Sequence, residues 1–219
     1  MEVEAVRRAA DRALSDLSLS LNVSVVVLAL FVLLFFVPLP VSPETFEWLL
    51  TARADPSPGW LFAPLVHAGV FHLISNVGQL LYFGIVPERR LSTREYLGFL
   101  GATGVLTTLI QVVQYNVRGI EGGIVGASGA TMAVMGFAVG HLGLSFAGRV
   151  DRTVVGSRRY RVMLFLMGCL WAAVQIPSDF IPGVSVGMGP PGDATSSGVA
   201  HLSGFLLGVG YAVRNARHG

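Results

Sequence analysis

The sequence contains no lysine, and all 15 basic residues among its 219 are arginine. A phosphate-binding P-loop, a Schiff-base enzyme and a Ser-Lys hydrolase each depend on a lysine, so these three classes are excluded. A single cysteine, Cys169, lies inside an apolar run. The chain therefore has no internal disulfide and no thiolate metal cluster, and we interpret Cys169 as a packing residue.

Charged residues are also scarce. They make up 13% of the chain, against 53% hydrophobic residues, whereas soluble domains carry about 25% charged residues. Such a composition cannot cover a water-facing surface, so a soluble globular domain is excluded. The 27 glycines lie mainly inside apolar runs, where glycine allows membrane helices to approach each other closely.

Six stretches are free of charge and mainly apolar. They cover residues 21–37, 71–86, 96–115, 128–146, 162–176 and 198–213. Several are shorter than the ~20 residues that cross a bilayer comfortably, which suggests local thinning of the bilayer. We therefore predict an all-α polytopic membrane protein with six transmembrane helices.

The distribution of arginine predicts the orientation of these spans. Thirteen arginines lie on the side of the two termini, and the opposite loops hold only Arg53 and Arg118. Because positive charge accumulates in cytoplasmic loops, we expect a multi-pass cell-membrane protein with both termini in the cytoplasm. Residues 1–20 are predicted as a cytoplasmic tail or interfacial helix, residues 21–214 as the membrane domain, and residues 215–219 as a short cytoplasmic tail.

Strongly polar side chains occur in three of the predicted spans: His72 and Asn76 in the second, Ser128 at the start of the fourth, and His201 in the sixth. Counting ~1.5 Å per helical residue from the nearest inner boundary places Asn76, Ser128 and His201 at a similar depth of ~18 to 20 Å. Taken singly, each could be ordinary: a serine bonded to its own helix, or a polar side chain joining two helices. Their common depth favours a site where a nucleophile, a base and hydrogen-bond donors meet, as acyl transfer requires.

A glycine-rich run, residues 122–127, precedes Ser128. Such a run bends tightly and leaves backbone N–H groups free, and at membrane depth it needs protein or a water-filled cavity around it. Ser128 is thus expected at a helix N-terminus, which favours a developing negative charge. His72 and Asn76 are four residues apart and share a helix face, so both can donate to that charge.

On the last span, Gly204 and Gly208 follow His201 at helical spacing. This strip of small residues predicts a close approach to the fourth span, which would bring His201 to Ser128 as a base. No acidic residue lies in any predicted span. His201 is therefore the only base expected within reach of Ser128.

Together these segments resemble the rhomboid family of intramembrane serine proteases. The resemblance rests on Gly126-Ala127-Ser128-Gly129, on His72-Leu73-Ile74-Ser75-Asn76 and on Ala200-His201-Leu202-Ser203-Gly204, and it covers about residues 21–214. It implies a six-helix rhomboid-like bundle without a cofactor or metal. It also implies a catalytic dyad, with Ser128 as nucleophile and His201 as general base and then general acid, and an oxyanion held by His72, Asn76 and the Ser128 N–H.

Five further positions bear on this resemblance. His67 fits a position where the family often has a histidine, and Met132 stands where members often place an aromatic residue against the base histidine. Trp48 and Arg53 are candidates, by region, for a Trp-Arg pair of the first outer loop. Asp193, in the last outer loop, is a minor candidate for a third catalytic member.

We therefore expect an endopeptidase that cleaves peptide bonds in or beside transmembrane segments of other membrane proteins. Its substrate would enter between the second and fifth spans, beneath an outer loop at residues 177–197 that could form a lid. One alternative is a noncatalytic rhomboid-like binder of membrane helices in quality control or trafficking, which needs neither Ser128 nor His201. Another, a small transporter built on histidines, lacks an intramembrane carboxylate. The expected partners are the lipid bilayer and transmembrane substrates, not nucleic acid, and the sequence indicates no oligomeric state.

Overall fold

The computed structural model describes residues 22–37, 39–150, 156–180 and 197–218. Over these ranges the regular secondary structure is helical, and an isolated β-bridge joins Ala52 and Ile124 in the connecting loops. The elements are α2 (Asn22–Phe36), α3 (Pro43–Leu50), α4 (Gly59–Phe62), the 3-10 helix η1 (Ala63–Leu65), α5 (Val70–Phe83), α6 (Ile85–Arg90), α7 (Thr93–Arg118), α8 (Ser128–Phe146), α9 (Arg158–Ser178) and α10 (Gly198–His218).

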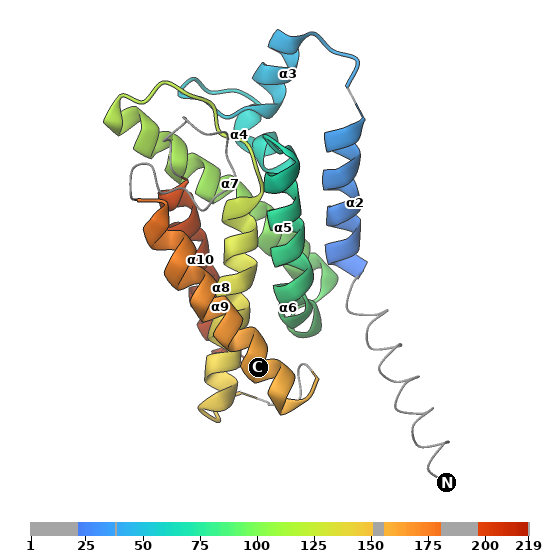
Figure 1. Cartoon of the computed structure of the whole chain (residues 1–219), viewed down its shortest axis with the longest axis vertical. Helices are drawn as coiled ribbons and strands as arrows, with labels where there is room; N and C mark the ends of the chain where they lie inside the picture. Colours follow the sequence, from blue (N-terminus) through green and yellow to red (C-terminus); the bar gives the residue numbers. More distant parts are fainter. Residues whose placement is uncertain (1–21, 38, 151–155, 181–196, 219) are drawn as a thin grey trace.

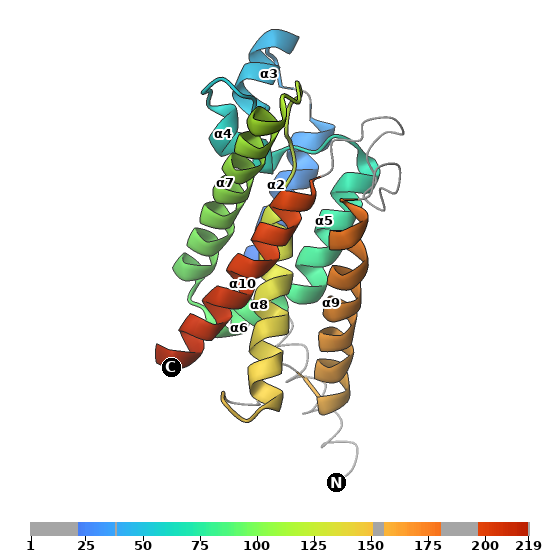
Figure 2. The same cartoon turned by 90° about the vertical axis from the view of Figure 1, so that its left-hand side faces the viewer.

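The long helices α2, α5, α7, α8, α9 and α10 lie roughly along one axis, and α3 and α4 lie at one end of the bundle (Figures 1 and 2). We call this end the α3 end; the C-terminus lies at the opposite end. Helix α8 occupies the centre, where it packs against α5, α7, α9 and α10. The predicted all-helical fold is confirmed for the described residues.

Four helical segments in the described part of the chain are long and apolar enough to cross a membrane. They are Val70–Arg90, which joins α5 and α6, then Thr93–Arg118 (α7), Ser128–Phe146 (α8) and Arg158–Ser178 (α9). Large apolar side chains are exposed on the outside of the bundle, including Phe71 and Leu170, as expected of a surface that faces lipid. The chain is thus a multi-pass membrane protein. The count of six spans also needs α2, which is apolar but shorter, and α10, and it stays a prediction.

Helices α7, α9 and α10 extend beyond the charge-free stretches that predict them, and capping residues set the starts of the first two. Ser92 and Glu95 form a capping box that starts α7, and Ser157 caps α9 ahead of Arg158. The last helix continues to His218, so residues 215–218 extend α10. Helix α8 has the predicted bounds, and the predicted segment 1–20 lies outside the described residues.

Helix α9 runs through Pro177 and ends at Ser178, so the loop predicted from residue 177 begins later. Proline has no N–H to donate to the carbonyl four residues earlier and its ring crowds that carbonyl, so Pro177 is expected to loosen the last turn without ending the helix before Ser178. Residues 181–196, which hold most of the predicted lid and Asp193, lie outside the described residues. The extension of α9 determines where Asp179 lies, since that residue is the C-cap of the helix.

Glycines allow α8 and α10 to approach each other at backbone distance. A Cβ placed on Gly204 would lie 2.2 Å from the Gly129 carbonyl oxygen, and one on Gly208 would lie 1.9 Å from that of Ala133. On the α8 side, a Cβ on Gly136 would lie 2.2 Å from the Phe205 carbonyl oxygen. The glycine spacing predicted this close approach, and it sets the position of His201 relative to the start of α8.

Candidate active site

Ser128 is the first residue of α8, as its glycine-rich approach predicts. The N-cap residue, Ala127, provides no side-chain cap, so the N–H groups of the first turn have no acceptor within the helix. Gly126 has a φ of 118°, a value that only glycine adopts readily, and it turns the chain into α8. The site of the candidate nucleophile therefore combines a serine hydroxyl with free backbone donors and the positive end of a helix dipole.

Backbone hydrogen bonds fix the segment that leads into Ser128. Ala52 and Ile124 exchange two bonds of 3.0 and 2.9 Å, and the Gly126 N–H donates to the Ala63 carbonyl at 2.9 Å. The first outer loop thus supports the start of α8. Defined hydrogen bonds of this kind are what non-helical backbone requires at membrane depth.

The same loop corrects one prediction about aromatic residues. The indole N–H of Trp60, not of Trp48, donates to the Arg53 carbonyl at 2.8 Å. Arg53 also forms an exposed ion pair with Glu47, while Trp48 is 58% exposed. Region alone could not choose between the two tryptophans, because the choice depends on how the loop folds back after residue 53.

Two polar side chains of α5 lie beside the turn into Ser128. The His72 ring lies against Gly126, where a Cβ would be 2.3 Å from His72 Cε1. Asn76 is 1% exposed, and its Oδ1 accepts a hydrogen bond from Thr131 Oγ1 at 3.1 Å; the same hydroxyl lies 3.1 Å from the Ser128 carbonyl oxygen. The amide nitrogen Nδ2 of Asn76 is buried and has no partner within the described ranges, which leaves a hydrogen-bond donor available.

His201 lies one helical turn before Gly204 and so reaches the same region from α10. It is 8% exposed, and His72 is near enough to interact with it electrostatically. Among the described residues, its Nε2 atom is buried without a hydrogen-bond partner. The structure thus brings Ser128, His72, Asn76 and His201 together, from three helices, around the start of α8.

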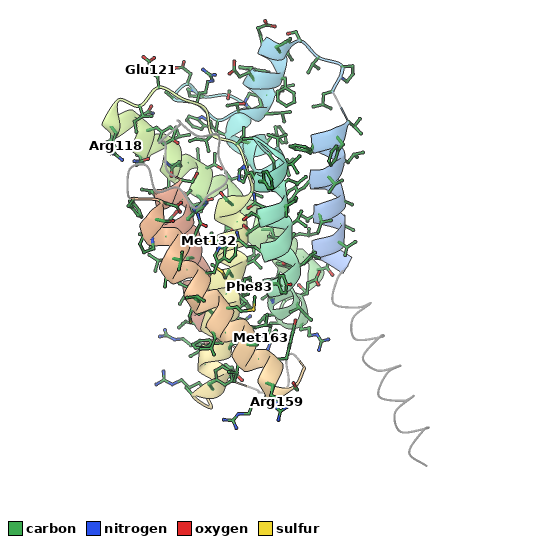
Figure 3. The ribbon with its side chains drawn as sticks, viewed as in Figure 1. Phe83, Arg118, Glu121, Met132, Arg159 and Met163 are labelled. Carbon is green, nitrogen blue, oxygen red and sulfur yellow. The ribbon has the colours of Figure 1, made fainter. Side chains whose placement is uncertain are left out.

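Two other residues noted in the sequence have different surroundings. The His67 ring packs against His72, with ring centroids 5.2 Å apart, and against Phe31 at 4.9 Å. Burial, with a smaller contribution from His72, lowers the pKa of His67 from 6.5 to about 3, so this ring is neutral at physiological pH. Met132 is fully buried within the central hydrophobic cluster of the bundle (Figure 3).

The sequence reasoning missed one residue of the site. Asp179 is 4% exposed, and its Oδ2 lies 2.6 Å from His201 Nδ1. The expectation of no buried acid at the site is therefore wrong. The predicted fifth span ends before Pro177, which places Asp179 in the predicted outer loop at residues 177–197. The available signal was the spacing of Gln175 and Asp179, which are four residues apart and lie on one face if the helix continues.

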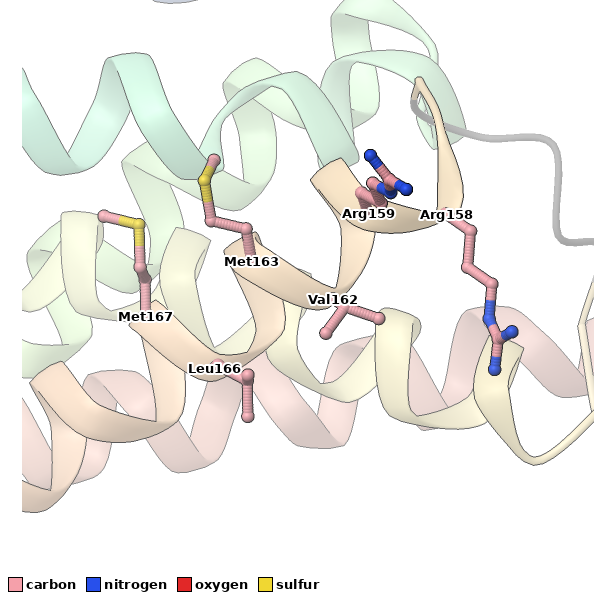
Figure 4. Close-up of a pocket in the computed structure, with 6 residues that line it drawn as sticks. All are labelled: Arg158, Arg159, Val162, Met163, Leu166 and Met167. Atoms are coloured by element: carbon pink, nitrogen blue, oxygen red, sulfur yellow. The ribbon is translucent and has the colours of Figure 1, made fainter.

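Two further features of the described structure lie away from the start of α8. No group of three or more His, Cys, Asp and Glu side chains in the described ranges is arranged to hold a metal ion. A surface pocket of about 560 Å³ lies on the first turns of α9, far from the start of α8 (Figures 3 and 4). It is lined by Arg158, Arg159, Val162, Met163, Leu166 and Met167.

Comparison with known families agrees with this geometry. The Rhomboid domain family matches residues 58–217, which is more than half of the chain. The chain belongs to the rhomboid family. A comparison with curated proteins finds no match. Rhomboid proteins are known as intramembrane serine proteases, although some are inactive, so the activity of this rhomboid protein has to be argued from its site.

Proposed function

We propose that this rhomboid protein is an intramembrane serine endopeptidase, with Ser128 as nucleophile and His201 as general base. The observation that carries the proposal is that two buried side-chain nitrogens near Ser128 have no hydrogen-bond partner. The Nε2 of His201 and the Nδ2 of Asn76 are buried without hydrogen bonds in the described structure, beside a serine at an uncapped helix start. Buried polar atoms are normally satisfied, and these are the atoms that an acyl-transfer reaction would use.

In the proposed reaction, His201 Nε2 takes the proton from Ser128 Oγ as this oxygen attacks the scissile carbonyl carbon. The carbonyl oxygen becomes an oxyanion that accepts hydrogen bonds from the first N–H groups of α8, from Asn76 Nδ2 and from His72. As the C–N bond breaks, His201 returns the proton to the leaving amine. In the second half, His201 Nε2 takes a proton from water as the water oxygen attacks the acyl carbon. His201 then returns this proton to Ser128 Oγ as the ester C–O bond breaks, which releases the carboxylic acid and restores Ser128.

The proposal includes a membrane arrangement with six spans, in which α2 and α10 also cross the bilayer and both termini are cytoplasmic. The α3 end and Ser128 would then lie toward the outer face. We propose that transmembrane substrates enter between α5 and α9. Support comes from the apolar side chains that both helices expose near this end, such as Ile74 and Val174, and from the low burial of α9.

Cleavage of a model transmembrane substrate by the full chain in liposomes tests the proposal. Ser128→Ala and His201→Ala should each lower kcat by about 10⁶-fold, to background, because loss of either member of a nucleophile–base pair removes nearly all of the catalysis that the pair provides. Ser203→Ala is the matched control: in the described structure its hydroxyl donates to the Ala200 carbonyl of its own helix, and this variant should cleave at the parent rate.

The outcomes separate an enzyme from a noncatalytic binder of membrane helices. Cleavage by purified Ser128→Ala at the parent rate would show that the assignment of the nucleophile is wrong. A parent protein that binds the substrate but does not cleave it, and whose binding is the same in both variants, would support the binder instead.

A further inference from the structure

Asp179 is a buried carboxylate to which the reaction above gives no part. Both of its oxygens are engaged: Oδ2 lies 2.6 Å from His201 Nδ1, and Oδ1 accepts a hydrogen bond from Gln175 Nε2 at 3.0 Å. The start of α10 packs against it closely, since a Cβ on Gly198 would lie 3.1 Å from Asp179 Cβ. Asp179 therefore lies between the end of α9 and the histidine of α10.

A carboxylate in this position is costly unless it has partners. Burial of a charge is strongly unfavourable, above all in the interior of a membrane protein, unless hydrogen bonds and an opposite charge compensate. Gln175, itself 7% exposed, holds one oxygen from the same helix face. The other oxygen has His201 as its partner, so the arrangement that stabilises Asp179 also determines how His201 is held.

The Asp179 contact selects one protonation form of His201. An ionised carboxylate only accepts hydrogen bonds, so in the neutral ring the proton resides on Nδ1 and is donated to Asp179 Oδ2. The second ring nitrogen, Nε2, then carries a lone pair. This is the atom that is buried without a hydrogen-bond partner in the described structure, and a general base has to present such a lone pair to the serine proton.

We propose that Asp179 is a positioning residue that completes a Ser128–His201–Asp179 triad. It keeps the Nδ1 proton in place, and it stabilises the imidazolium that forms when Nε2 takes the proton from Ser128 Oγ. Asp179 itself stays ionised throughout, and the transferred proton leaves from Nε2 to the amine. This inference rests on the proposed protease function and adds to it an acid contributed by α9.

Asp179→Asn in the full chain, reconstituted in liposomes, tests the triad. Asparagine keeps the size of the side chain but can offer Nδ1 an N–H donor, which favours the wrong tautomer. An equivalent replacement in a Ser-His-Asp triad lowers kcat by about 10⁴-fold; here we expect kcat to fall by at least about 10²-fold with little change in KM. Asp55→Asn, on the exposed outer loop, is the matched control and should keep the parent kcat.

The thermal unfolding of each variant distinguishes positioning from support of the fold. A purely structural contact predicts a lower unfolding temperature and a normal kcat for the protein that remains folded. If Asp179→Asn is folded and its kcat lies within about threefold of the parent value, the triad is excluded while the Ser128–His201 protease stands. If the parent protein does not cleave at all, the proposed protease function is wrong. This result differs from the one that excludes the triad alone, so the two outcomes are distinguishable.

A spectroscopic measurement keeps the inference testable even if Asp179→Asn does not fold. In the parent protein with ¹⁵N-labelled histidine, the His201 signals are identified among the five histidines by their loss in His201→Ala. At alkaline pH we expect a protonated Nδ1 and an unprotonated Nε2. A neutral His201 ring protonated on Nε2 would overturn the proposal.

Discussion

Helices α8 and α9 are alike in sequence character and differ in their surroundings. Their most apolar stretches have the same mean hydropathy of 1.4, yet 72% of that stretch is buried in α8 and 28% in α9. Gly136 and Gly140 of α8 meet the backbone of α10, whereas α9 exposes large side chains such as Leu166 and Leu170. Hydropathy identifies both as membrane helices, and only the placement of small residues separates the central helix from the peripheral one.

This difference divides the candidate site between two closely packed helices and the end of a peripheral helix. Ser128 and His201 belong to the α8–α10 pair, in which backbones touch and interiors of this density resist displacement. Asp179 belongs to the end of α9, whose outer surface faces lipid. We therefore expect substitutions on α8 and its neighbours to affect catalysis strongly, and those on the outer face of α9 to have little effect.

The largest effect outside Ser128, His201 and Asp179 is expected where α5 meets the start of α8. Asn76→Ala removes the free Nδ2 donor, and loss of one oxyanion donor typically lowers kcat by about 10²- to 10³-fold. Ser75→Ala, the preceding residue on the same helix, is the control and should retain nearly full kcat. Equal cleavage rates for the two variants would exclude Asn76 from the oxyanion site.

The next effect concerns the contact of α8 with α10. Gly204→Ala would place a methyl group 2.2 Å from the Gly129 carbonyl oxygen and push His201 away from Ser128; a misplacement of ~1 Å can lower the rate by about 10²-fold. Gly210→Ala, where nothing lies within 4 Å, should leave cleavage unchanged. A Gly204→Ala variant as active as Gly210→Ala would contradict the rigid pairing of these helices.

A smaller effect separates the two faces of α9. Leu164 is fully buried and Leu170 is 67% exposed. Leu164→Ala should lower the free energy of unfolding by about 2 kcal/mol or more because it leaves a cavity, and Leu170→Ala should change it by less than about 0.5 kcal/mol. Reversible unfolding in mixed detergent micelles measures both, and equal losses would mean that α9 is not oriented as described.

The smallest effect is a pH dependence that comes from His67. Because its pKa falls from 6.5 to about 3 in the folded protein, the unfolded chain binds more protons between these values. Stability is thus full above about pH 6.5 and decreases as the pH falls toward 3. His67→Gln should lessen the drop in unfolding temperature between about pH 7 and pH 5 relative to the parent protein. An unchanged drop would show that His67 does not titrate in this way.

Much of the fold and the centre of the site follow from the sequence. Apolar stretches bounded by arginines located the long helices, and the glycine run before Ser128 predicted the helix start. Polar residues are so rare in the spans that His72, Asn76, Ser128 and His201 were conspicuous, and the structure gathers these four. Such features are local, or depend on one periodic pattern, and can be read without knowing the tertiary fold.

The contacts that the sequence did not predict depend on where chain segments meet. Asp179 was assigned to a loop because a proline preceded it, although α9 continues through Pro177 and carries the acid to His201. The pairing of Trp60 with Arg53 likewise depends on the path of the outer loop. Neither contact follows from a periodic pattern in the sequence, so the folded structure is needed to identify the partners.

Covalent labelling of the parent protein in liposomes with a fluorophosphonate tests the central claim most directly, because it needs no substrate. Mass spectrometry of the digested protein should find the adduct on Ser128, and labelling should disappear in both Ser128→Ala and His201→Ala while persisting in Ser203→Ala. An adduct on another serine, no adduct in the folded parent protein, or equal labelling without His201 would contradict the claim that Ser128 is a nucleophile activated by His201.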